Sequence, residues 1–221
     1  MKAIRALTVA AAALSLLPAV AAAQSGRPFN DAWFWGIKGG STFMSAPSKP
    51  NLTSPMAGLD WMITRTHGGL YVSFDQSFFN AQGAINDSIA PTDSGRHVVN
   101  LKDVRRLTIA LMGFPGDNPT WHPYAGLGIT YNQVASVKPA TPYNSSDQAS
   151  LGQAIIAQAK AVFAPVLMLG VQARARQASV FLQGMAWPSN SNFFLYNTHG
   201  FNGSLEAGVR INVGSAIADD R

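Results

Sequence analysis

The feature that most constrains the fold is a two-residue alternation of apolar and polar residues after residue 23. An apolar residue at every second position is typical of a β-strand whose two faces meet different surroundings. The clearest run is 204–213, where the apolar positions are Leu205, Ala207, Val209, Ile211 and Val213. Because a helix would repeat every 3.6 residues instead, the pattern predicts an all-β protein.

The alternation recurs in eight segments of about ten residues, the length with which a β-strand crosses a bilayer. These segments are 33–43, 55–65, 69–79, 104–114, 123–134, 166–175, 179–187 and 204–213. Their connections alternate between long and short, starting with the long segment 44–54 and the short segment 66–68. An even strand count with this alternation is typical of an antiparallel up-and-down barrel with one rim outside the cell.

The composition of the polar face indicates which way each face points. That face is rich in Gly, Ser, Thr and Asn, and Glu206 is the only glutamate of the chain. A solvent-exposed face would carry many Lys and Glu side chains, whereas small residues suit the narrow interior of an eight-stranded barrel. We therefore expect a transmembrane β-barrel with its apolar face against lipid.

Aromatic residues gather near the ends of the predicted strands, as in the girdles of transmembrane barrels. Towards the short-turn rim they are Trp33, Trp35, Trp121 and Tyr124. Towards the long-loop rim they are Phe78, Phe79, Tyr131 and Trp187. We expect these eight residues to form two aromatic girdles.

Seven charged residues fall on the inward face by the same alternation. They are Lys38, Asp60, Asp75, Arg106, Arg174, Glu206 and Arg210. Buried charges persist only when they are paired and hydrogen-bonded. The cluster is either the lining of a selective pore or a salt-bridge network that plugs the barrel, and the narrowness of eight strands favours the plug. Because closure brings the last strand beside the first, Lys38 and Glu206 are expected to be neighbours.

The N-terminal segment has the three parts of a secretory signal peptide. Lys2 and Arg5 precede an apolar run over 6–23, which ends in three alanines. The predicted organisation is a signal peptide at 1–23 and an outer-membrane β-barrel domain at 24–221. Two of the five net positive charges lie in the signal peptide, and nothing in the remainder resembles a basic stripe for nucleic acid.

The longest predicted loop contains one helical stretch, at 147–163. Alanines dominate it, Asp147 or Ser150 provides a cap, and Pro165 is expected to end it. The full prediction is an eight-stranded antiparallel up-and-down transmembrane β-barrel with one short helix in the third long loop. We expect a monomer whose partners are outer-membrane lipid and a surface ligand of the long loops, and no nucleic acid.

Two segments resemble the small bacterial outer-membrane barrels of the OmpA/OmpX-like and OmpW-like class. His122–Tyr131 is similar to the strand of that class with the pattern PYxGxGxGY, and Leu205–Val213 to its closing strand. The resemblance implies a bacterial outer-membrane location. The chain departs from the class at its C-terminus, because such barrels usually end on an aromatic residue and this one ends at Arg221.

The residues that could support catalysis or metal binding do not form a known pattern. The four histidines, His67, His97, His122 and His199, fall in predicted turns and loops without metal-ligand spacing. His199 and Ser204 loosely resemble a lipid deacylase pair, but they stand five residues apart instead of two. The absence of cysteine excludes thiolate metal sites. We therefore expect no enzyme activity, no metal and no cofactor.

Three functions remain open from the sequence. The first is a non-enzymatic outer-membrane barrel with a structural or surface-interaction role. The second, implied by the OmpW-like resemblance, is a narrow channel for small apolar or amphipathic solutes. The third is a soluble lipocalin-like periplasmic binding barrel, in which the Leu, Ile and Val face would line a pocket.

Overall fold

A computed structural model describes most of the chain after residue 28. The described residues are 29–46, 48–86, 89, 95–116, 118–175, 177–190, 192–195 and 200–215. The predicted signal peptide at 1–23 and the C-terminal end after Ser215 lie outside them. Among the helices of these ranges, none is long and apolar enough to cross a membrane.

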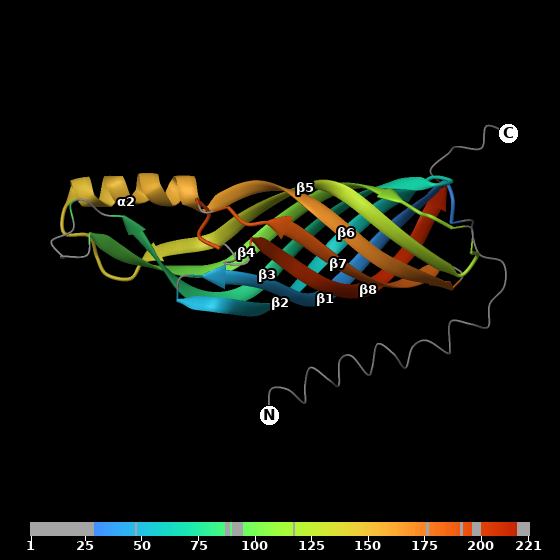
Figure 1. The fold of residues 1–221 in the computed structure, drawn as a ribbon, viewed down its shortest axis with the longest axis horizontal. Coiled ribbons are helices and arrows are strands. Elements are labelled where there is room, and N and C mark those ends of the chain that lie inside the picture. Colours follow the sequence, from blue (N-terminus) through green and yellow to red (C-terminus); the bar gives the residue numbers. More distant parts are fainter. Residues whose placement is uncertain are drawn as a thin grey trace, which may run out of the picture.

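The described residues form a closed eight-stranded barrel (Figure 1). The strands are β1 (Ala32–Ala46), β2 (Lys49–Thr64), β3 (Gly68–Asn86), β4 (Arg96–Gly113), β5 (Trp121–Pro139), β6 (Ala161–Ala175), β7 (Ala178–Pro188) and β8 (Phe201–Ser215). Each strand pairs antiparallel with the next, and β1 closes the barrel against β8. The predicted all-β, up-and-down topology is confirmed.

The strands are longer than the ten residues expected. They contain 11 to 19 residues, and β3, β4 and β5 reach 19, 18 and 19. The long connection predicted at 44–54 is wrong, because Met44 pairs with Leu52 and only two residues separate β1 from β2. In Figure 1 the ends of β3, β4 and β5 project beyond the other strands on the left. This projection extends the barrel past the span that a bilayer requires.

A β-bulge marks the base of the projection. The register of β3 against β4 shifts between Ser77 and Asn80, and Asp103 of β4 has a φ of 55°. The backbone N–H of Phe79 donates a hydrogen bond to Asp103 Oδ1 at 3.1 Å. Bulges of this kind bend a strand and re-aim its side chains. Beyond the bulge, the outward face of β3 carries Asn80, Gln82, Ala84 and Asn86, so it is more polar than the face before the bulge.

The outward face is apolar on all sides of the barrel from the level of Leu107 to the short-turn rim. Exposed residues include Ile37 on β1, Leu111 on β4, Leu127 on β5 and Ile211 on β8, and Leu111 and Leu127 are 70% and 68% exposed. A water-soluble barrel would turn these side chains inward, so the lipocalin-like alternative is wrong in its orientation of the apolar face. An outward apolar band around a closed barrel is the surface that lipid requires.

The loop between β5 and β6 contains the helix α2 (Ser146–Ala159). The Ser145 side chain caps its first turn by accepting a hydrogen bond from the backbone N–H of Gln148 at 3.2 Å. The expected helix at 147–163 is too long at its C-terminal end, because residues 161–163 pair with β5 as the start of β6. Pro165 accordingly lies within β6 and not at the end of the helix.

The interior has apolar side chains at both ends and charged side chains between them. At the short-turn end, Phe29, Phe34, Met62 and Phe114 belong to one buried cluster. At the long-loop end, Leu52, Val99, Leu101 and Val134 belong to a second cluster, together with 193–195 from the loop before β8. Ile155, Ile156 and Ala159 of α2 pack against this second cluster. Both ends of the barrel are therefore filled by apolar side chains.

The first prediction tests the membrane face. Ile109 points outward in the middle of the part of β4 between the bulge and the short-turn end, and is 51% exposed. Ile109→Arg is expected to lower the free energy of unfolding in lipid vesicles by about 2–4 kcal/mol, because its charge would lie in hydrocarbon. The control Asn100→Arg, on the outward face of the projecting part of β4, should change it by less than about 0.5 kcal/mol. Equal tolerance of both substitutions in urea titrations would contradict a lipid-facing band.

Candidate functional site

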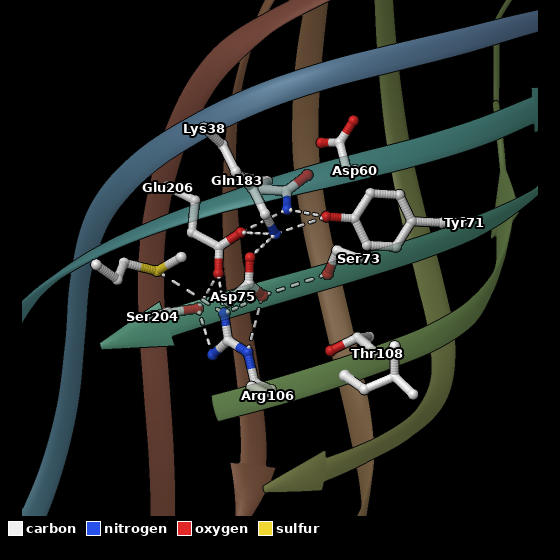
Figure 2. A network of polar contacts seen from close by, with 12 residues as sticks. Lys38, Asp60, Tyr71, Ser73, Asp75, Arg106, Thr108, Gln183, Ser204 and Glu206 are labelled. Atoms are coloured by element: carbon white, nitrogen blue, oxygen red, sulfur yellow. Dashed lines mark hydrogen bonds and ion pairs between the residues drawn. The ribbon is translucent and has the colours of Figure 1, made fainter. Parts of the chain in front are cut away.

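The central feature of the interior is a group of six buried charged residues, which we call the interior charge network. Its members are Lys38, Asp60, Asp75, Arg106, Glu206 and Arg210. They are contributed by β1, β2, β3, β4 and β8. Figure 2 shows Lys38, Asp75, Arg106 and Glu206 facing one another across the interior. Three are acids and three are bases, so the network carries no net charge.

Four members form a continuous ion-paired group. Lys38 Nζ lies 2.8 Å from Asp75 Oδ1 and 2.7 Å from Glu206 Oε2. The guanidinium of Arg106 contacts the same two carboxylates, with 3.0 Å between Nη2 and Asp75 Oδ2. The Ser204 hydroxyl donates a further hydrogen bond of 2.6 Å to Glu206 Oε1. Each carboxylate is thus shared between two cations, which offsets the cost of removing all four groups from water.

The remaining two members form a separate pair nearer the short-turn end. Arg210 Nε and Nη2 donate hydrogen bonds to both carboxylate oxygens of Asp60, at 3.0–3.3 Å. Arg210 Nη1 donates to Gln172 Oε1 at 2.8 Å. The fork of the guanidinium suits a carboxylate held in this way.

Uncharged polar side chains join the two parts of the network. Gln183 Nε2 donates to Glu206 Oε2 at 2.8 Å and to the Tyr71 hydroxyl at 3.0 Å. Gln183 Oε1 accepts from Arg210 Nη2 at 3.1 Å and from the Tyr124 hydroxyl at 2.9 Å. The amide of Gln183 therefore uses its donors towards one part and its acceptor towards the other.

Aromatic rings cover the two buried guanidinium groups. The Arg210 guanidinium carbon lies 3.7 Å from the centre of the Phe181 ring, and that of Arg106 lies 4.7 Å from the Trp187 ring. A guanidinium over an aromatic face is attracted by the negative charge of the ring face, most strongly when both are removed from water. These contacts add to the ion pairs and fill the space around them.

Two glycines give the carboxylates the room that they occupy. A Cβ atom at Gly36 would overlap Asp60 Oδ1, and a Cβ atom at Gly58 would overlap Asp75 Oδ1. Both glycines point into the barrel beside the charges. The preference for small residues on the inward face is thus a requirement of the network at these positions.

Arg174 is the one expected member that the structure places elsewhere. It lies at the short-turn end of β6, and its side chain is only partly buried. The prediction that it belongs to the charge cluster is wrong because alternation fixes the face of a strand but not the depth along it. The seven expected residues are three acids and four bases, and without Arg174 the numbers of acids and bases are equal.

The structure places the expected girdle residues on both sides of the barrel wall. Trp33, Trp35, Phe78 and Trp121 are exposed on the outside. Tyr131 is half-buried, and its ring lies 4.7 Å from that of Phe163, which is 71% exposed.

Three assignments to the girdles are wrong. Tyr124 and Trp187 are buried, at 3% exposure each, and contact Gln183 and Arg106 inside the barrel. Phe79 is half-buried and packs against the apolar cluster at the long-loop end. Tyr124 and Trp187 occupy the inward phase of their strands, and the bulge turns Phe79 away from the outer surface.

The described histidines and Ser204 lie in different parts of the barrel. His67 is exposed in the turn between β2 and β3. His97 and His122 lie in strands and not in loops, and their rings stack on Tyr143 and Phe29. His199 lies outside the described residues, and Ser204 points inward to Glu206.

Sequence reasoning missed the uncharged members of the site. Tyr71 shares the inward phase of Asp75, and Gln183 shares that of Trp187, so alternation could have placed both inside. No signal in the sequence showed that the Gln183 amide would join Glu206 to Arg210. That junction depends on the pairing register of β7 against β8, which sets Gln183 opposite Glu206.

The fold of the barrel is similar to that of a solved structure. Neisserial surface protein A matches with a TM-score of 0.53 at 10% identity, covering 81% of this chain and 96% of that one. This is the fold of a small eight-stranded outer-membrane β-barrel. At 10% identity the likeness concerns the fold alone.

Two further structures are similar to the barrel. One is Ail, the attachment invasion locus protein of Yersinia pestis in complex with the heparin analogue sucrose octasulfate, with a TM-score of 0.48, 10% identity, and 83% and 99% of the two chains covered. The other is the outer-membrane protein OprG from Pseudomonas aeruginosa, with a TM-score of 0.42, 13% identity, and 83% and 94% covered. The searches of family models and of curated proteins found no match to the barrel.

The second prediction concerns the balance of interior charge. Glu206→Gln leaves three buried cations against two carboxylates, and it is expected to lower the free energy of unfolding by about 3–5 kcal/mol. Urea titration of the barrel in lipid vesicles measures this loss. Asp147→Asn removes an exposed carboxylate from α2 and serves as a control with an expected change of less than about 0.5 kcal/mol.

A double variant separates charge balance from lost contacts. Lys38→Met combined with Glu206→Gln removes one charge of each sign and leaves two acids with two bases. We expect this double variant to be more stable than Glu206→Gln alone, because no buried charge is left in excess. A double variant that loses the sum of both single losses would show that charge balance does not stabilise the interior.

The third prediction concerns the room beside the carboxylates. Gly36→Ala is expected to lower the free energy of unfolding by about 1–3 kcal/mol, because its methyl group would displace the Asp60 carboxylate. Gly39→Ala is the matched control on the same strand, since its methyl group would meet only the Met56 carbonyl oxygen at 3.5 Å. Indistinguishable urea midpoints for the two variants would contradict the steric role of Gly36.

Proposed function

We propose that this protein is a closed outer-membrane barrel with a structural or surface-interaction role, and that it is not a channel. The observation that carries the proposal is the filling of the interior from end to end by buried side chains. The interior charge network occupies the middle, and the apolar clusters that include Phe114 and Leu101 occupy the two ends. An eight-stranded barrel has an interior just wide enough for such side chains.

The charges do not form the lining of a path for ions. Asp60, Asp75 and Glu206 are each paired with cations of the protein itself. An ion passing through would also have to leave its water to cross the apolar side chains at either end, at a large cost in free energy. The channel for small apolar or amphipathic solutes remains the second candidate, because the apolar end clusters are the surfaces such a solute would contact.

The surface role is supported by the projection on the long-loop side. Strands β3, β4 and β5 extend beyond the apolar band, and α2 packs on the projection (Figure 1). The apolar outer band and the predicted signal peptide together support placement in the bacterial outer membrane, with the projection outside the cell. Enzyme activity is not part of the proposal.

The fourth prediction is that the wild-type barrel does not conduct. The mature chain from Gln24, inserted in a planar bilayer in 1 M salt, is expected to show no steady current, since its interior is filled. The matched comparison is the double variant Arg106→Ala with Glu206→Ala, which removes two large interior side chains of opposite charge. Its current is expected to exceed that of the wild type, because part of the filling is gone. Discrete openings of the wild type, changed in ion selectivity by Glu206→Gln, would overturn the closed-barrel proposal and favour the channel.

A further inference from the structure

The outer surface carries a groove between the side chains of β3, β4, β5 and β6. It has a volume of about 440 Å³, and its lining residues include Leu107, Ile109, Ile129, Tyr131 and Phe163. This volume lies within the range of small-molecule binding sites. The groove lies on the apolar band, so it is open to the hydrocarbon of the membrane and not to water.

At its end nearer the long-loop rim, the groove is followed by a positively charged residue, Arg105. Leu107 and Tyr131 are paired across β4 and β5, and the next outward pair towards the long-loop rim is Arg105 and Gln133. Successive outward residues of a strand are about 7 Å apart. Arg105 is exposed, and Gln76 of β3 and Gln133 of β5 flank it in register. A guanidinium and two amides therefore stand immediately above an apolar groove.

The same outward face continues with positive charge above Arg105. Its exposed cations are Lys102 and Arg96 on β4 and Lys138 on β5. Among the described residues of this face, the carboxylate present is that of Asp103, and it accepts the hydrogen bond from the Phe79 backbone. The face thus attracts an anion at the level where the outward side chains change from apolar to polar.

We infer that this groove and Arg105 form a binding site for a phosphate-bearing lipid of the leaflet on the long-loop side. One acyl chain lies along Leu107, Ile109 and Ile129, and the phosphate binds Arg105 with Lys102 beside it. The guanidinium suits the phosphate because its parallel N–H groups can donate to two oxygens at once.

This inference rests on the membrane placement of the proposed function, but not on the closed interior. It gives the barrel a preferred lipid at one part of its circumference, between β3 and β6. The opposite rim provides a comparison, because its exposed cation Arg65 is paired with Asp31 at 2.8 Å.

The experiment measures lipid binding to the mature barrel in detergent by native mass spectrometry. The probes are dioleoyl phosphatidic acid and dioleoylglycerol, which share acyl chains and differ in the phosphate. We expect phosphatidic acid to bind about tenfold more tightly, a difference of about 1.4 kcal/mol. Salt at 1 M should reduce this preference by screening the exposed cations.

Three variants test the parts of the site. Arg105→Gln combined with Lys102→Gln should abolish the preference for phosphatidic acid and leave dioleoylglycerol binding unchanged. Ile129→Trp fills the groove and should weaken both lipids. Arg65→Gln removes a cation at the opposite rim and should change neither.

Other outcomes would overturn the inference. Equal binding of the two lipids, or a preference that survives in the double variant, would show that the phosphate is not recognised at Arg105. Displacement of phosphatidic acid by inorganic phosphate at equal concentration would show an anion site without a lipid. None of these results depends on conductance, so failure of the lipid site and failure of the closed-barrel proposal are distinguishable.

Discussion

Ion pairing in the barrel interior is the interaction on which the rest of this structure depends. Lys38 and Arg106 share the carboxylates of Asp75 and Glu206, while Arg210 is paired with Asp60. Charges removed from water without a partner would destabilise the barrel far more than any single packing contact can stabilise it. The equality of acids and bases is therefore the condition under which an eight-stranded barrel tolerates a charged interior.

Several other features follow from accommodating these charges. Gly36 and Gly58 are small because carboxylates occupy the space beside them, and the rings of Phe181 and Trp187 lie against the guanidinium groups. Gln183 contributes no charge, yet it joins the two parts of the network through both atoms of its amide. The apolar clusters then separate this polar centre from water at both ends.

The alternation of the sequence was sufficient to predict the topology and the face of most strand residues, because a strand's two faces repeat strictly every two residues. It also indicated the charged interior. Alternation does not give the depth of a residue along the barrel axis, so it does not separate Arg174, at the end of β6, from the charged residues far from the rim. Tyr124 and Trp187 lie inside although aromatic residues tend to lie at membrane interfaces, because their positions have the inward phase of their strands. The lengths of β3 to β5 do not follow from a lipid-facing pattern, because beyond the bulge the outward face is largely polar and the inward face is apolar, the reverse of the membrane-spanning part.

The pairing of Lys38 with Glu206 has a consequence for the order in which the barrel is assembled. These residues belong to the first and last strands and are 168 positions apart in the chain. Their ion pair therefore forms only when β8 closes the sheet against β1, after the largest loop-closure entropy of the fold has been overcome. Until then each carries an incompletely paired charge on an open sheet edge. A slip of one residue at this seam would turn Glu206 towards lipid, so the same ion pair that completes the interior also selects the register in which the barrel closes.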